Sequence, residues 1–142
     1  MRILVDINVI LDAVLERRAW LDEAGRLLSA IESGEVEGYV AAHTITTIHY
    51  IVAKENGRAV AARVVTDLLR IVRVVQIGGA DFLQALVLSI DDYEDAVQVA
   101  AALQIGADYL VTRNTRDYKH APVEIRTPGE VLGLLPSICA GA

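Results

Sequence analysis

Residues 91–114 read DDYEDAVQVAAALQIGADYLVTRN, and the fold can be inferred outward from them. Acidic residues open an alanine-rich apolar segment at 94–105, which predicts a helix that ends at Gly106. The apolar residues at 109–112 then predict a strand, and polar residues follow it. Carboxylates in a first helical turn lie near the positive end of the helix dipole, which favours the ionised form that binds a hard divalent cation.

A second candidate acid, Asp6, stands far earlier in the chain, at the end of the apolar run 3–5. The carboxyl ends of the strands in an open parallel sheet line one crevice. Asp6 and the turn at 112–117 are therefore expected to converge, although they are distant in sequence. The sequence predicts one acidic, metal-binding site.

Helical and extended patterns alternate along the chain. We predict helices at 8–15, 21–31, 44–55, 59–69, 81–88 and 94–105, and strands at 3–5, 38–41, 71–75, 109–112 and 123–125. This alternation predicts an α/β fold, a three-layer α/β/α sandwich with a mainly parallel central sheet. No repeat, low-complexity tract or linker interrupts residues 1–142, so we expect a single domain.

The composition limits the class of protein. Hydrophobic residues make up 54% of the chain, yet no run approaches the ~20 apolar residues of a membrane span. The N-terminus has no apolar signal core, and we expect a cytoplasmic protein with no membrane partner. The single Cys139 has no partner for an internal disulfide and no metal-ligand spacing around it, so we expect a buried or tail thiol.

The net charge of −6 argues against nucleic-acid binding that is driven by charge alone, but it does not exclude a nuclease. Basic residues still cluster locally in two places. These clusters are either substrate-binding groups or ordinary solvated surface, and their members are Arg113, Arg116, Lys119 and Arg126 in one segment and Arg17 and Arg18 in the other.

Two of the acids have an alternative interpretation as helix caps. Asp6 could cap the first helix, but Asn8 can fill that role and leaves Asp6 for a site. Asp92 and Asp95 are spaced as in a capping box, which explains Asp92 more easily than Asp95. We therefore predict Asp95 as a metal ligand and Asp92 as a cap or an outer acid.

Polar residues stand both before and after the predicted strand at 109–112. Asp108 precedes the strand and is expected on the opposite rim of the sheet, whereas Thr112, Asn114 and Asp117 follow it and can reach the crevice. Asp117 could instead be a turn residue paired with Arg113 or Arg116. The histidines at 43, 49 and 120 form no ligand motif, and no glycine-rich phosphate loop is present, so nucleotide cofactors are not expected.

Three segments, taken in order, resemble the PIN-domain family: ILVDINV at 3–9, YEDAVQ at 93–98 and LVTRNTRDY at 110–118. The resemblance is closest to the small bacterial members that include VapC-type toxins. It covers essentially the whole chain, and TPGE at 127–130 is similar to the usual ending of these proteins.

The resemblance implies a compact α/β/α fold and a ribonuclease that depends on Mg²⁺ or Mn²⁺. It implies that Asp6, Asp95 and Asp117 are the catalytic and metal-binding acids. Supporting roles are expected for Asn8, Thr47, Asp92, Thr112 and Asn114, and substrate contacts for Arg113, Arg116 and Lys119.

The chain departs from the family pattern at one position. The family commonly has a glutamate in the helix after the second strand, and Thr47 stands where that acid is expected. The loss of one carboxylate weakens metal affinity, although Thr47 could still orient a metal-bound water.

Three functions compete at this stage. The preferred one is a metal-dependent endoribonuclease that hydrolyses RNA as the toxin of a toxin–antitoxin pair, with an antitoxin as partner and a homodimer as its assembly. The alternative is a catalytically degenerate PIN domain that binds RNA or protein. A phosphatase of the haloacid-dehalogenase type is disfavoured, because such enzymes need an aspartate where this chain has Asn8.

Overall fold

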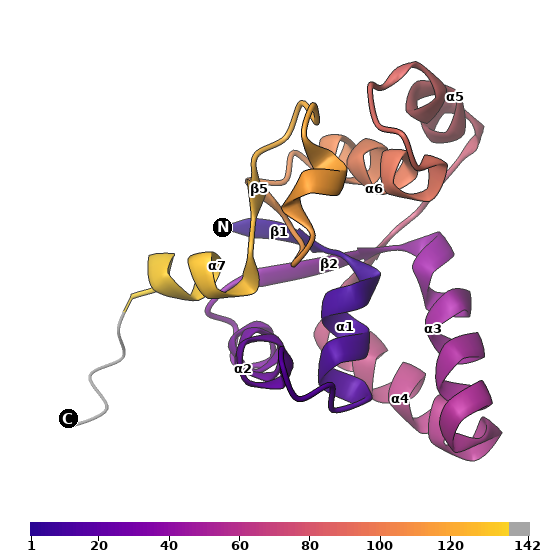
Figure 1. The fold of residues 1–142 in the computed structure, drawn as a ribbon, viewed down its shortest axis with the longest axis vertical. Helices are drawn as coiled ribbons and strands as arrows, with labels where there is room; N and C mark the ends of the chain where they lie inside the picture. Colours follow the sequence, from indigo (N-terminus) through magenta and orange to yellow (C-terminus); the bar gives the residue numbers. More distant parts are fainter. Residues whose placement is uncertain (137–142) are drawn as a thin grey trace.

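A parallel sheet of five strands forms the centre of the computed structural model, which describes residues 1–136 (Figure 1). The strand order is β3-β2-β1-β4-β5, and every neighbouring pair is parallel. The strands are β1 (Arg2–Val5), β2 (Glu37–Ala41), β3 (Arg73–Val75), β4 (Tyr109–Val111) and β5 (Ile125–Arg126). The predicted three-layer α/β/α sandwich is confirmed.

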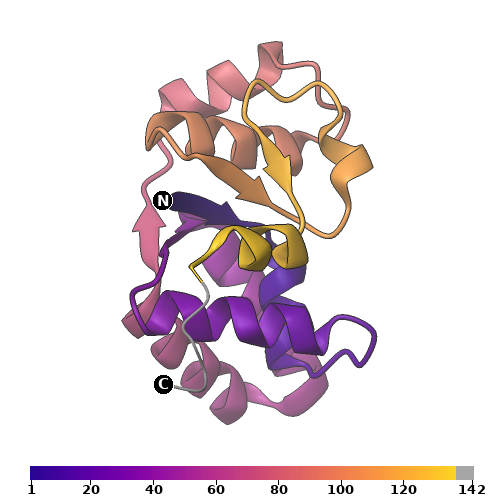
Figure 2. The same cartoon turned by 90° about the vertical axis from the view of Figure 1, so that its left-hand side faces the viewer.

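Helices cover both faces of the sheet. One face packs against α1 (Ile7–Val14), α2 (Leu21–Glu32), α3 (Ala42–Asn56), α4 (Arg58–Ile71) and α7 (Pro128–Leu134). The other face packs against α6 (Tyr93–Gln104), with α5 (Gly79–Val87) beside it and the 3₁₀ helix η1 (Thr115–Tyr118) near its start. Figure 2 shows this division, with α5, α6 and η1 above the sheet and the other helices below.

Strand alternation explains the two layers. Successive side chains of a strand point to opposite faces, and Ile3 and Val5 join the core beneath the sheet while Leu4 joins the core under α6. All three side chains are fully buried, because β1 lies in the middle of the sheet between β2 and β4. Continuous apolar runs are typical of such central parallel strands.

The structure moves several predicted boundaries. Helix α4 extends to Ile71, so the predicted strand 71–75 begins only at Arg73. Gly57 alone separates α3 from α4, with a φ of 91° that favours glycine. The sequence analysis missed η1 and α7, although Thr127 and Glu130 form a capping box at the start of α7.

Two further points concern the rest of the chain. Cys139, expected as a buried or tail thiol, lies outside the described residues. No helix in the part of the chain that the structure describes is long and apolar enough to span a membrane.

Candidate active site

Strand register brings Asp6 and Thr112 together at the carboxyl edge of the sheet. Val5 pairs with Val111 in neighbouring parallel strands, so the residue after each strand lies beside the other. The Thr112 hydroxyl donates a 2.9 Å hydrogen bond to Asp6 Oδ2 and accepts one of 3.1 Å from the Asn114 backbone N–H. The late strand and its turn therefore hold the carboxylate of Asp6 in place.

Asp6 is buried, with 3% of its surface exposed, and its side-chain hydrogen-bond donors are neutral groups. Its Oδ1 atom accepts a 2.6 Å hydrogen bond from Gln98 Nε2 on α6. Burial raises the pKa of Asp6, and the hydrogen bonds from Thr112, Gln98 and Tyr118 oppose that shift. Within residues 1–136, no ion pair joins Asp6 to a Lys or Arg side chain.

Tyr118 connects Asp6 to Asp95. Its hydroxyl oxygen lies 3.1 Å from Asp95 Oδ1 and 3.5 Å from Asp6 Oδ1. Burial, with the charge of Asp92 next in importance, raises the pKa of Asp95 to about 6, and Asp6 and Asp117 add smaller contributions. The structure thus brings two of the predicted acids to one hydroxyl group.

Asp117 lies in the outer part of the same site. It lines a cleft of about 220 Å³ together with Asp91, Asp92, Asp95 and Arg116. Asp92 caps α6, because its Oδ1 accepts a 3.0 Å hydrogen bond from the Asp95 backbone N–H. The cap anchors Asp95 at the mouth of the cleft, and no ion pair joins Asp117 to Arg113 or Arg116 in the described chain.

The donor chemistry of this site fits a hard divalent cation. Carboxylate oxygens are the ligands that Mg²⁺ prefers. Burial is the main cause of the raised pKa of Asp95, and a cation would neutralise the neighbouring carboxylates that raise it further. Gln98 Oε1 is also buried without a hydrogen-bond donor among the described groups, so the site has room for a further donor. The geometry is incomplete, since no three His, Cys, Asp or Glu side chains in residues 1–136 form a ready-made metal group.

Thr47 brings no ligand toward the acids in this structure. It lies in α3, where its hydroxyl donates a 3.4 Å hydrogen bond to the backbone carbonyl of His43 one turn earlier. His43 in turn faces Glu94, and burial lowers its pKa more than Glu94 raises it. Because Thr47 carries no charge, the position expected to hold a glutamate supplies no carboxylate.

Arg113 is not among the residues that line the cleft. Its Nε atom forms a 2.8 Å ion pair with Asp12, whose side chain is 1% exposed, and its guanidinium stacks 3.9 Å from the centre of the Trp20 ring. Arg17 reaches the other oxygen of Asp12 at 3.4 Å. Arg113 thus fastens the end of β4 to α1, and of the predicted substrate-binding residues only Arg116 lines the cleft.

The remaining predicted residues fall into three groups. Asn8 lies inside α1 rather than at its cap, because the helix already begins at Ile7 and Asp6 occupies the cap position. Asn114 precedes η1 and is half-buried, and Lys119 is exposed just after η1. Asp108 is bonded to the Arg2 backbone N–H at 2.8 Å, on the opposite rim as expected.

Sequence analysis did not single out Gln98 or Tyr118 as site residues. Gln98 follows Asp95 by three positions, a spacing that places both on one side of a helix, and it interrupts a run of buried apolar residues. That combination was a usable signal. Tyr118 gave none, because its position depends on the short turn of η1.

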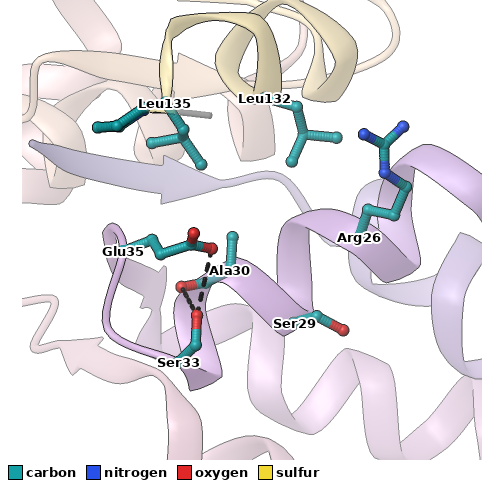
Figure 3. A pocket seen from close by; sticks show the side chains of 8 residues that line it. Arg26, Ser29, Ala30, Ser33, Glu35, Leu132 and Leu135 are labelled. Atoms are coloured by element: carbon teal, nitrogen blue, oxygen red, sulfur yellow. Dashed lines mark hydrogen bonds between the residues drawn. The ribbon is translucent and has the colours of Figure 1, made fainter. Parts of the chain in front are cut away.

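A larger cavity of about 540 Å³ lies between α2 and α7 (Figure 3). Arg26 and Ser29 line it from α2, and Leu132 lines it from α7. Its one carboxylate, Glu35, accepts a 3.2 Å hydrogen bond from Ser33. Because this cavity lacks paired acids, its chemistry offers less for a divalent cation than the cleft beside Asp95.

Comparisons with known proteins agree with this fold. The family model described as PIN domain matches residues 2–116. Among curated proteins, none matches the sequence.

Solved structures share the fold at low sequence identity. VapBC2 of Rickettsia felis, solved with a promoter DNA fragment, has a TM-score of 0.72 at 15% identity, covering 89% of this chain and 98% of that one. VapBC of Salmonella typhimurium, also bound to DNA, has a TM-score of 0.71 at 14% identity, with coverage of 90% and 98%. VapC20 of Mycobacterium tuberculosis, a toxin that cleaves the sarcin–ricin loop, has a TM-score of 0.63 at 19% identity, with coverage of 76% and 86%.

Proposed function

The chain belongs to the PIN-domain family, and from that premise we propose that it is a metal-dependent endoribonuclease that hydrolyses RNA phosphodiester bonds. One observation carries the proposal. Asp6 and Asp95, which are far apart in sequence, both lie within 3.5 Å of the Tyr118 hydroxyl. A buried carboxylate and a half-buried one that share no cationic partner among the described residues are costly to fold, and such costs are typical of functional sites.

Asp6, Asp95 and Asp117 would hold the Mg²⁺ or Mn²⁺ ion. When bound, such an ion lowers the pKa of a coordinated water and stabilises the negative charge that develops on the phosphate. Thr112 and Gln98 fix the orientation of Asp6 through hydrogen bonds to its two oxygens. These bonds hold the carboxylate in one orientation.

Basic groups at the edge of the cleft would contact the RNA backbone. Arg116 lines the cleft beside Asp95 and Asp117, and Lys119 follows on the exposed end of η1. Their positive charges offset part of the repulsion between the acidic cleft and phosphate. The chain's net charge of −6 means that substrate binding has to rely on such local groups and on the bound cation.

The structural neighbours support a partner as well as a substrate class. Two of them are VapBC assemblies and one is a toxin that cleaves the sarcin–ricin loop. We therefore propose that this chain is the toxin of a toxin–antitoxin pair, that an antitoxin protein restrains it, and that its substrate is a structured RNA. It would act in the cytoplasm as a single PIN-like domain and as a homodimer.

A second candidate function rests on Thr47. Its position carries no charge, and residues 1–136 contain no ready-made group of three metal-binding side chains. A PIN domain with too few ligands would bind RNA or protein without cleaving it. This candidate predicts binding to RNA that does not depend on divalent metal.

Cleavage of a mixed RNA pool with Mn²⁺ distinguishes the two functions. We expect the wild-type protein to cleave RNA and Asp6→Asn to lose at least about a hundredfold of that activity, because it removes a charged ligand. Asp108→Asn is the matched control, since Asp108 lies on the opposite rim and its asparagine can still accept the bond from Arg2. Equal cleavage by wild type and Asp6→Asn would contradict the proposal, and metal-independent RNA binding without cleavage would favour the second candidate.

A further inference from the structure

One hydroxyl group stands between the two carboxylates to which the proposed function assigns the metal. Tyr118 offers a single hydrogen and faces two acceptors, Asp95 at 3.1 Å and Asp6 at 3.5 Å. Gln98 Nε2 donates to Asp6 and also lies 3.5 Å from the Tyr118 oxygen. Asp6 Oδ1 and Asp95 Oδ1, the oxygens that face Tyr118, therefore both lie within hydrogen-bond distance of a neutral donor.

These donors offset the cost of bringing the carboxylates together. The pKa values of Asp6 and Asp95 are both raised, chiefly by burial, and for each the hydrogen bond from Tyr118 acts in the opposite direction. Burial and the neighbouring carboxylates also raise the pKa of the Tyr118 hydroxyl, so it stays protonated and remains a donor. A cation held at Asp6 Oδ1 and Asp95 Oδ1 would compete with this hydroxyl for the same oxygen atoms.

We propose that Tyr118 is a positioning residue that competes with the cation. In the cation-free protein its hydroxyl lies between Asp6 and Asp95 and donates to one of the facing oxygens, and this hydrogen bond has to break before a divalent cation can bind at those oxygens. The hydroxyl therefore lowers cation affinity while it stabilises the empty site. This inference rests on the proposed metal-dependent function. It adds that a side chain of this protein, Tyr118, limits how readily the site binds its cation.

The ring of Tyr118 has a separate role, which makes the hydroxyl testable on its own. The side chain is 2% exposed and packs in the core with Leu4, Tyr39 and Leu110. Phenylalanine keeps this packing and removes only the oxygen. Tyr118→Phe is therefore expected to fold and to differ from wild type mainly at the two carboxylates.

Calorimetric titration with MnCl₂ measures the competition directly. We expect Tyr118→Phe to bind Mn²⁺ with a dissociation constant roughly tenfold lower than that of wild type, because a hydrogen bond to a charged group no longer has to be broken. We also expect it to melt at a lower temperature than wild type in EDTA, and the difference to shrink in excess Mn²⁺. Tyr39→Phe is the matched control, since its hydroxyl bonds Glu37 and not the site acids, and its Mn²⁺ affinity should equal that of wild type.

The outcomes separate this inference from the proposed function. Equal or weaker Mn²⁺ binding by Tyr118→Phe, with wild type binding normally, would overturn the competition and leave the nuclease proposal standing. Mn²⁺ binding by Tyr118→Phe, with none by wild type, would support the competition, because it would mean that the hydroxyl prevents the cation from binding. Absence of Mn²⁺ binding in both proteins at millimolar concentration would overturn the competition together with the metal-dependent function.

Discussion

Thr112 donates a 2.9 Å hydrogen bond to Asp6 across the join between two neighbouring parallel strands. Both side chains are almost completely buried, and each follows directly on the last residue of its strand. The bond exists because the register of β1 and β4 makes these two residues neighbours. The fold therefore assembles the inner part of the site from backbone pairing, before any ligand arrives.

Thr112→Val tests the hydrogen bond between Thr112 and Asp6. Valine has nearly the same shape, but it leaves Asp6 Oδ2 without its donor and the Asn114 N–H without its acceptor. We expect a loss of about 1–3 kcal/mol in the free energy of unfolding, measured by urea denaturation in EDTA. Thr112→Ser keeps the hydroxyl and should lose less, so a valine variant as stable as the serine variant would contradict the assignment.

Asp95 makes the stability of the metal-free protein depend on pH. Its folded-state pKa is about 6, above the ordinary value of 3.8, so the folded protein holds this proton more tightly than the unfolded chain does. The stability that Asp95 contributes is then fully present below about pH 4, declines as the pH rises from about 4 to about 6, and is lost above about pH 6. Urea denaturation in EDTA at pH 5 and pH 7 measures the change.

Asp95→Asn supplies the control for that pH dependence. The free energy of unfolding of this variant should decline less between pH 5 and pH 7 than that of wild type, because the variant lacks the titrating carboxyl group. Mn²⁺ added to the wild type at pH 7 should raise the melting temperature, because an ion that binds only the folded state stabilises it by mass action. An identical pH profile in wild type and Asp95→Asn would show that this carboxyl group does not titrate in the window.

The sequence predicts the central fold well because its signals are local and strong. The acid that ends β1 and the acidic start of α6 are both readable from apolar runs and their boundaries. Short elements are harder to predict, since η1 with its four residues is not among the predicted elements and the predicted strand 123–125 shares only residue 125 with the two-residue β5. The capping box of Thr127 and Glu130 was nevertheless a signal for α7 that sequence analysis passed over.

The direction of the Arg113 side chain follows from the alternation of side chains along β4. Successive residues at the end of a strand point to opposite faces, so Thr112 can reach Asp6 only if Arg113 turns toward the other face. On that face Arg113 forms an ion pair with Asp12 and stacks on Trp20. The role of Tyr118 could not be predicted, because it depends on a 3₁₀ turn that brings distant residues together.

Arg113 and Arg116 should therefore respond differently to the same substitution. Arg113→Ala removes the closest cationic partner of the buried Asp12, and we expect a loss of about 2–4 kcal/mol in the free energy of unfolding. Arg116→Ala lies at the exposed cleft and should change stability by no more than about 0.5 kcal/mol. It should instead weaken RNA binding and reduce the dependence of that binding on salt.

Parallel urea denaturation and RNA-binding titrations at two salt concentrations compare the two arginine variants. Because Arg113 is fixed against α1, its replacement should affect RNA binding only through the loss of folded protein. A pronounced loss of RNA affinity in folded Arg113→Ala, with none in Arg116→Ala, would reverse these assignments.

Thr47→Glu addresses the neutral position in α3. A glutamate there would supply the additional oxygen ligand, and we expect Mn²⁺ to bind about two- to tenfold more tightly, measured by calorimetry. The gain should be smaller than the loss caused by Asp6→Asn, because the surrounding side chains are not arranged to hold the new carboxylate. Thr46→Glu is the matched control, since Thr46 makes the same kind of bond to the His43 carbonyl but is exposed. An equal gain in both variants would show that added negative charge, rather than a ligand at position 47, accounts for the tighter binding, whereas a gain confined to Thr47→Glu identifies the ligand that this chain lacks.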